Sequence, residues 1–159
     1  MSDTNRGLIE LRGEDSLKFL QGQVSCDLHQ LSDDNFIRGC HCTPKGRVIF
    51  LFSAGLKDSD CIVLETHPSI VDTAIASLKK YAVFSKTKIT DISDQKLSIE
   101  PELSDLDRLR AGIADITSGT TDQFIPQMLN LDLLNFLPVQ RSVMAHPLRE
   151  SDLKARARV

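Results

Sequence analysis

The sequence predicts an α+β fold, in which a largely antiparallel sheet carries helices packed on one face. Three observations predict it. Short apolar runs recur through the first part of the chain, a Pro-Lys-Gly turn joins two of them, and helical spacing is confined to two segments between the runs. The predicted order over residues 7–92 is therefore β-α-β-β-β-α-β.

The first strand and helix lead into a glutamine-rich bend. Residues 7–12 alternate in polarity and predict a short strand. Residues 13–16 begin a helix, because their carboxylates suit its positive end, and Leu17, Phe19 and Leu20 supply its apolar face. The helix then runs into a glutamine-glycine-glutamine group.

A hairpin follows. Residues 36–42 and 47–52 are strand-like, and the turn at 43–46 has proline second and glycine fourth, as in a type I turn with a bulge. Because the second run is continuously apolar, we expect that strand to be covered on both faces. Residues 53–60 are expected to form a second turn, and residues 61–64 a third strand.

The next segment has the strongest helical pattern. Pro68 suits the first helical position. The apolar residues that follow share one helical face, and they are Val71, Ala74, Ile75, Leu78 and Ala82. Residues 86–92 are predicted to return as a strand.

Beyond this point the composition changes, which predicts four parts of the chain. Residues 1–95 form the α+β domain, and residues 96–107 an acidic, solvated connection. Residues 108–136 form a second unit, with an apolar run near its end, and residues 137–159 a basic tail that is expected to be disordered.

The totals exclude several classes of protein. The chain has 159 residues and a net charge of -3, so its total charge does not point to nucleic acid or an anionic membrane. No apolar run is long enough to cross a membrane, and the polar N-terminus is not a secretory signal. With four cysteines and no signal, free thiols in a reducing cytoplasmic setting are expected.

The glutamine-rich bend is the main candidate site. Gln21 and Gln23 can each donate and accept hydrogen bonds, and Gly22 would allow a positive φ or a close backbone approach. These residues, closed by Asp27, could recognise the edge of a heterocycle. The alternative interpretation is that the amides satisfy backbone groups and Asp27 caps a turn.

Cys40-His41-Cys42 suggests a metal site, but its spacing suits structural zinc poorly. On a strand the two thiols would share one face and the histidine would lie on the other. We therefore expect buried or half-buried free thiols. Cys26 and His29 could meet on one turn, but no third group completes a nucleophilic site, so no catalytic residue is predicted.

Four stretches resemble one family when taken together and in order. They are FLQGQVSCDL, CTPKGRV, LKKYAVFSKTKI and RLRAGIADITSGTTDQFIPQMLNLDLL. The chain resembles the YgfZ-type folate-binding proteins, relatives of the glycine-cleavage T-protein, an aminomethyltransferase. The resemblance covers residues 8–92 and resumes over residues 106–135. It implies that residues 1–95 are similar to the N-terminal folate-binding domain of that family.

The resemblance also implies a function. Family members bind tetrahydrofolate and support the assembly or repair of iron–sulfur proteins, including those that modify tRNA. The residues that would serve folate here are Gln21, Gln23, Asp27, Lys45, Lys80 and Arg108. Carboxamides and a carboxylate would meet the pterin edge, and the cations would meet the acidic tail. Iron–sulfur proteins are the implied partners, and direct contact with tRNA stays open.

Three departures from the family matter. Arg110 stands where relatives usually have glutamate. Only residues 93–107 bridge a gap that is long in relatives, and from Leu137 the chain lacks the family's Lys-Gly-Cys-Tyr-Thr-Gly-Gln-Glu run. The chain therefore looks shortened in the middle and at its C-terminus. Besides the accessory role, an aminomethyltransferase and an inactive truncated relative remain alternatives.

Overall fold

The computed structural model describes residues 6–95, 97–100, 104–111, 113, 115–125, 128 and 139–140. Its elements, in chain order, are β1 (Gly7–Arg12), α1 (Ser16–Gln21), η1 (Leu28–Gln30), β2 (Asn35–Cys42), β3 (Val48–Asp58), β4 (Cys61–Thr66), η2 (Pro68–Ile70), α2 (Val71–Tyr81), β5 (Lys88–Asp91), α3 (Asp105–Arg110) and β6 (Val139–Gln140). The predicted order of strands and helices over residues 7–92 is confirmed.

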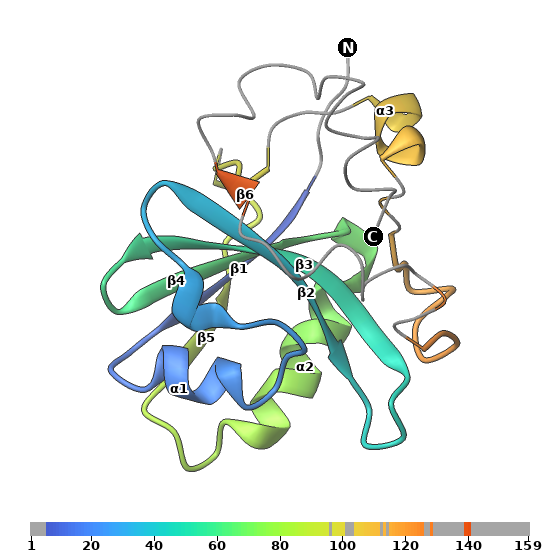
Figure 1. Ribbon diagram of the computed structural model, residues 1–159. Helices are drawn as coiled ribbons and strands as arrows, with labels where there is room; N and C mark the ends of the chain where they lie inside the picture. Colours follow the sequence, from blue (N-terminus) through green and yellow to red (C-terminus); the bar gives the residue numbers. More distant parts are fainter. Residues whose placement is uncertain are drawn as a thin grey trace.

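The strands form one antiparallel sheet in the order β5-β1-β4-β3-β2-β6. Figure 1 shows α1 and α2 on the same side of this sheet, whereas α3 lies beyond its other side. The predicted α+β class, with helices packed on one face, is therefore confirmed for the two helices of the first part of the chain.

Alternation along the strands builds an apolar layer on each face. The larger core joins the strands to α1 and α2 and includes Phe50, Leu64 and Leu78. On the opposite face two smaller clusters form, one around Phe36 and one around Cys40. Later residues of the chain join them, and they are Ile92, Leu97, Ile99, Ile116 and Phe124. The sheet is thus covered on both faces, as the apolar run in β3 predicted.

Two expectations about exposed segments were wrong. Residues 53–60 are not a turn, because β3 continues to Asp58 and its residues Ser53–Gly55 pair with β2 on one side and β4 on the other. Nor is the acidic segment solvated throughout, since Ile99 and Glu100 are each only 4% exposed. Both errors come from partners that lie far away in the sequence.

The backbone conformation expected at Gly46 is confirmed, whereas the one suggested for Gly22 is not found. At the hairpin tip Gly46 has a φ of 79° and its N–H donates to the Thr43 carbonyl at 2.8 Å, as in the expected turn. Gly22 has an ordinary helical φ of -74°, and a Cβ added to it would meet nothing closer than 3.5 Å. The conformational freedom expected at Gly22 is therefore not used.

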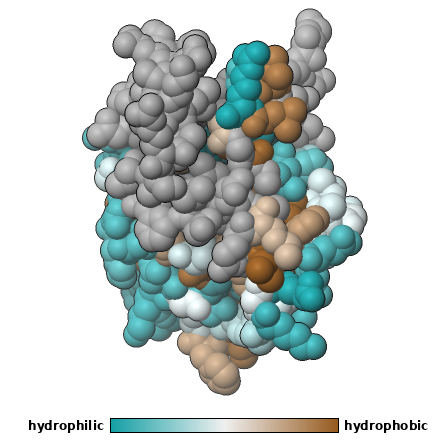
Figure 2. Space-filling view, turned by 45° about the vertical axis from the view of Figure 1, so that its right-hand side comes forward, coloured by the Kyte–Doolittle hydropathy of each residue, from teal (hydrophilic) through white to brown (hydrophobic). Residues whose placement is uncertain are grey.

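The loop between α2 and β5 ends in an exposed apolar tip. Val83 is 72% exposed and Phe84 fully exposed. Figure 2 shows an apolar projection at the lower end of the molecule, where Figure 1 places this loop. Within residues 6–95, the large exposed apolar residues are thus gathered at the C-terminal end of α2 and just beyond it, and they are Tyr81, Val83 and Phe84.

The apolar run expected over residues 128–136, apart from Met128, and most of the basic tail lie outside the described residues. The same holds for Gly112, Pro126 and Gln127 of the stretches that resemble the family. None of the helices in the described ranges is long and apolar enough to cross a membrane.

The glycine in β2 gives a direct test of the packing. A Cβ added to Gly39 would lie 2.6 Å from Cys26 Sγ and 2.9 Å from Phe52 Cζ. Gly39→Ala should therefore lower the free energy of unfolding by about 1–3 kcal/mol through overpacking, as measured by urea denaturation. Gly22→Ala is the matched control, since it should be neutral or slightly stabilising. Equal stability of the two variants would contradict this packing.

Candidate functional site

β2 carries side chains for both faces of the sheet. Arg38, Cys40 and Cys42 lie on the face away from α1 and α2, whereas His41 lies on the helix face. The thiols and the histidine are on opposite faces, as the strand pattern predicted.

His41 links the glutamine-rich bend to α2. Its Nδ1 lies 2.6 Å from the Gln23 carbonyl oxygen, and its Nε2 lies 2.9 Å from Ser77 Oγ. Since a carbonyl only accepts, Nδ1 carries the proton, and Nε2 of the neutral ring accepts from the Ser77 hydroxyl. Burial lowers the pKa of His41, opposed by the hydrogen bond to Gln23, so the neutral ring is the form that the fold favours.

The first glutamine of the bend is used within the chain. Gln21 Nε2 donates to the Cys26 carbonyl at 2.9 Å, and the Leu28 N–H donates to Gln21 Oε1 at 2.7 Å. Asp27 caps η1 by accepting from the His29 N–H at 3.0 Å. Gln21 and Asp27 therefore shape the bend, whether or not a ligand also meets them.

The second glutamine is placed beside α2. Its carbonyl reaches Ser77 through His41, and the Tyr81 ring lies edge-on to the His41 ring with centroids 6.2 Å apart. Tyr81 is 47% exposed, and Lys80 beside it is also exposed. The fold thus brings Gln23 to the last turns of the helix that carries Lys80. Lys45 is exposed at the hairpin tip.

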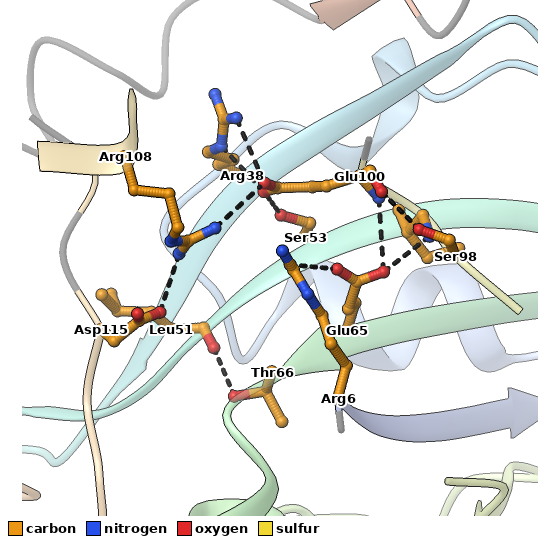
Figure 3. Close-up of polar contacts among 11 residues, drawn as sticks. Arg6, Arg38, Leu51, Ser53, Glu65, Thr66, Ser98, Glu100, Arg108 and Asp115 are labelled. Carbon is orange, nitrogen blue, oxygen red and sulfur yellow. Dashed lines mark hydrogen bonds and ion pairs between the residues drawn. The ribbon is translucent and has the colours of Figure 1, made fainter. Parts of the chain in front are cut away.

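The opposite face of the sheet contains a buried ion pair (Figure 3). Arg38 Nε donates to Glu100 Oε1 at 2.8 Å and Nη2 to Oε2 at 3.3 Å, so the pair is bidentate. The Arg38 and Glu100 side chains are only 6% and 4% exposed. Ser53 Oγ also donates to Glu100, and the Arg38 guanidinium lies over the Phe36 ring.

Further charges extend this pair in both directions. Arg108 Nη1 lies 3.6 Å from Glu100 Oε2, and its Nη2 donates to Asp115 at 2.8 Å. Arg6 pairs with Glu65, whose Oε2 accepts from the Ile99 N–H at 2.6 Å. We call these six side chains the charge cluster, and they are Arg6, Arg38, Glu65, Glu100, Arg108 and Asp115.

The pKa values of Glu65 and Glu100 shift in opposite directions. Burial raises the pKa of Glu65, although Arg6 and the Ile99 N–H oppose the change. Burial acts the same way on Glu100, but there Arg38, Ser53 and Arg108 outweigh it and hold the pKa below its ordinary value. Glu100 is therefore the firmly ionised centre of the cluster.

The six residues predicted to bind folate do not all lie on one face of the sheet. Arg108 reaches Arg38 through Glu100, so it lies on the opposite face of the sheet from Gln23 and α2. Its positive charge is already matched by Glu100 and Asp115. The structure brings Gln23 and the helix of Lys80 together, and it keeps Arg108 apart from them.

Sequence reasoning missed Arg38, Glu65 and Glu100. A signal was present for the first two, because each is a charged residue inside a largely apolar strand, where a buried ion needs a partner. Nothing local marks Glu100 within its acidic segment. Among the described residues no group of three or more histidine, cysteine or acidic side chains could hold a metal ion.

Comparisons with known proteins first define the class of fold. The chain superposes on the crystal structure of the glycine cleavage system aminomethyltransferase T from Bartonella henselae with a TM-score of 0.53 and 13% identity. The match covers 57% of this chain and 25% of that one. The described sheet and helices therefore have the fold of part of a T-protein. No family model matches the chain.

Curated sequences then give the particular relatives. The chain is 41% identical over 90 residues to the tRNA-modifying protein YgfZ of Sodalis glossinidius, covering 57% of this chain and 27% of that protein. It is 34% identical over 130 residues to YgfZ of Vibrio vulnificus, covering 77% and 40%. An uncharacterized protein of Haemophilus influenzae is 31% identical over 169 residues, covering 84% of this chain and 60% of that one.

The chain is thus a relative of the YgfZ proteins, and the expected resemblance is confirmed. It spans well under half the length of the YgfZ relatives named above.

Because the ion pair is buried, we expect that removing one of its charges lowers the free energy of unfolding substantially. Glu100→Gln would leave Arg38 buried and unpaired, so the free energy of unfolding should fall by about 3 kcal/mol or more, measured by urea denaturation. Glu14→Gln, which breaks the exposed pair with Lys86, should leave stability nearly unchanged. A Glu100→Gln variant as stable as this control would show that the pair is not buried.

Because His41 is buried in its neutral form, we expect the stability of the fold to depend on pH. Because its pKa is lowered in the fold, the unfolded chain takes up the proton first as pH drops below the ordinary value of 6.5. Stability should therefore fall from about pH 6.5 downward, by at most about 1.4 kcal/mol per pH unit for this group. His41→Gln should lose that component of the pH profile, whereas the exposed His29→Gln should retain it. Identical profiles for wild type and His41→Gln would refute a buried neutral ring.

Proposed function

We propose that this chain acts in tRNA modification as a folate-binding accessory factor for iron–sulfur proteins, in the cytoplasm, rather than as an enzyme that turns over substrate. Support for the tRNA role comes from the curated relatives named tRNA-modifying protein YgfZ. The T-protein fold supports a folate-related role, since the fold is shared with an aminomethyltransferase. The iron–sulfur partners come from the family resemblance alone.

The observation that carries the folate proposal is the junction of the glutamine-rich bend with α2. His41 joins the Gln23 backbone to Ser77, which brings residue 23 close to the last turns of the helix. Among the described residues no hydrogen-bond partner of the Gln23 carboxamide is found, and in this proposal its donor and acceptor groups serve a ligand. A pterin presents a flat ring with a donor and acceptor edge that a carboxamide can match.

Two exposed groups of α2 complete the proposed site. The Tyr81 ring is half-exposed beside His41 and offers an aromatic surface to a flat heterocycle. Lys80 supplies a cation for the acidic tail of folate, since no carboxylate of the described residues pairs with it. In this proposal Gln21 and Asp27 hold the shape of the bend, and Lys45 offers a further exposed cation at the hairpin tip.

Arg108 offers a second place for the acidic tail. It is adjacent to Arg38 on the other face, but Glu100 and Asp115 already neutralise it. A ligand carboxylate there would have to displace one of these groups. The helix-face site needs no such displacement, and for this reason we favour it.

Tetrahydrofolate titration by calorimetry tests the proposal. Gln23→Ala and Lys80→Gln should each weaken binding about tenfold, the loss of one hydrogen bond or ion pair to the ligand. The matched control is Lys79→Gln, an exposed neighbour on the same helix, which should bind like wild type. Arg108→Gln should also bind like wild type.

Three outcomes would count against the proposal. Absence of binding heat at millimolar tetrahydrofolate would remove the folate role. Weaker binding in Arg108→Gln with full binding in Gln23→Ala would move the site to the other face. For the tRNA role, the chain should restore the modified-nucleoside content of digested tRNA in cells lacking their YgfZ relative, and an unchanged content would refute it.

A further inference from the structure

Cys40 and Cys42 form a pair of thiols that the proposed function does not use. Their Sγ atoms lie 3.7 Å apart on the same face of β2, close to where the register shifts between His41 and Cys42. A disulfide has an S–S length of about 2.05 Å, so closing this gap requires a movement of under 2 Å. Rotation of two side chains can supply such a movement without unfolding the strand.

The surroundings favour a thiolate within this pair. Ser25 Oγ accepts from the Cys40 N–H and from the Cys40 thiol, each at 3.2 Å. Once Cys40 loses its proton, the serine hydroxyl can donate to the sulfur instead. The pKa of Cys40 is lowered to about 7, because the Cys42 thiol donates to it, with burial opposing and Ser25 assisting. By contrast, burial raises the pKa of the isolated Cys26 thiol to about 12.

The two thiols differ in access. Cys40 is 1% exposed and packs in the small cluster with Val48 and Ile116, whereas Cys42 is only half-buried at the end of the strand. The hydrogen bond to Cys40 and burial raise the pKa of Cys42, so the resting thiolate is on Cys40. Because the two sulfurs share one hydrogen bond, transfer of its proton to Cys40 gives the outer Cys42 thiolate. An outer thiol that a small reagent can reach is thus backed by an inner thiol within contact distance.

We propose that Cys40 and Cys42 form a thiol–disulfide exchange site that accepts a low-molecular-weight disulfide such as oxidised glutathione. The Cys42 thiolate attacks one sulfur of the reagent, a mixed disulfide forms, and one glutathione thiolate leaves. The Cys40 thiolate then attacks the Cys42 sulfur, and the second glutathione leaves. Two electrons pass from the cysteine sulfurs to the two glutathione sulfurs, and the two cysteine protons end on the released thiols.

The test exploits the position of the pair between two trypsin sites. Trypsin cleaves after Arg38 and Lys45, so both thiols fall in one peptide, residues 39–45. The folded full chain is equilibrated in glutathione buffers of graded redox potential. The chain is then unfolded, its remaining thiols are alkylated, and the mass of the tryptic peptide is measured by mass spectrometry. We expect it to become lighter by the mass of two hydrogen atoms and to escape alkylation, while Cys26 and Cys61 stay alkylatable after unfolding.

The same measurement on the chain unfolded in urea distinguishes the effect of the fold from the effect of the short spacing between the two cysteines. The equilibrium constant for disulfide formation in the folded chain should exceed that in the unfolded chain by about tenfold or more, because the fold holds the two sulfurs together. Cys40→Ser should accumulate a glutathione adduct on Cys42, and Cys61→Ser should close the disulfide like wild type. An equal or lower constant in the folded chain, or a stable glutathione adduct in wild type, would overturn the proposal.

Discussion

Adjacent side chains of β2 point to opposite faces of the sheet, and this alternation separates the polar chemistry of the chain. His41 enters the layer of α1 and α2, where it joins the Gln23 backbone to Ser77. Arg38 enters the other layer and meets Glu100, and the two thiols lie on that same face. A shift of β2 by one residue would exchange the two sets and leave each without its partner.

The buried ion pair helps to hold residues 97–100 on the far face of the sheet. A guanidinium with 6% of its side chain exposed needs a carboxylate, and the carboxylate comes from residue 100, far along the chain. Glu65 holds the Ile99 and Glu100 N–H groups from the next strand but one. Charged contacts, together with Ile99 and Ile116, thus fix an otherwise polar segment on the sheet.

Most of the fold was predictable because its signals are local. Apolar alternation, the Pro-Lys-Gly turn and the spacing of α2 all lie within short windows. Prediction failed where a distant partner decides. Ser53 and Gly55 resemble turn residues, but two neighbouring strands pair with them, and Glu100 resembles a solvated acid until Arg38 is placed beside it. For the candidate site, local reasoning found Gln23, but only the fold shows that α2 adjoins it and that Arg108 does not.

Nuclear Overhauser spectroscopy of the labelled chain tests the separation of the two faces most directly. We predict contacts from the His41 ring to the Phe50 and Tyr81 rings, whose centroids lie 5.6 and 6.2 Å away. We also predict contacts from the Arg38 guanidinium to Ser53 and to the ring of Phe36. Contacts from the His41 ring to Ile116 or Ile99 instead would place it on the wrong face and contradict the account.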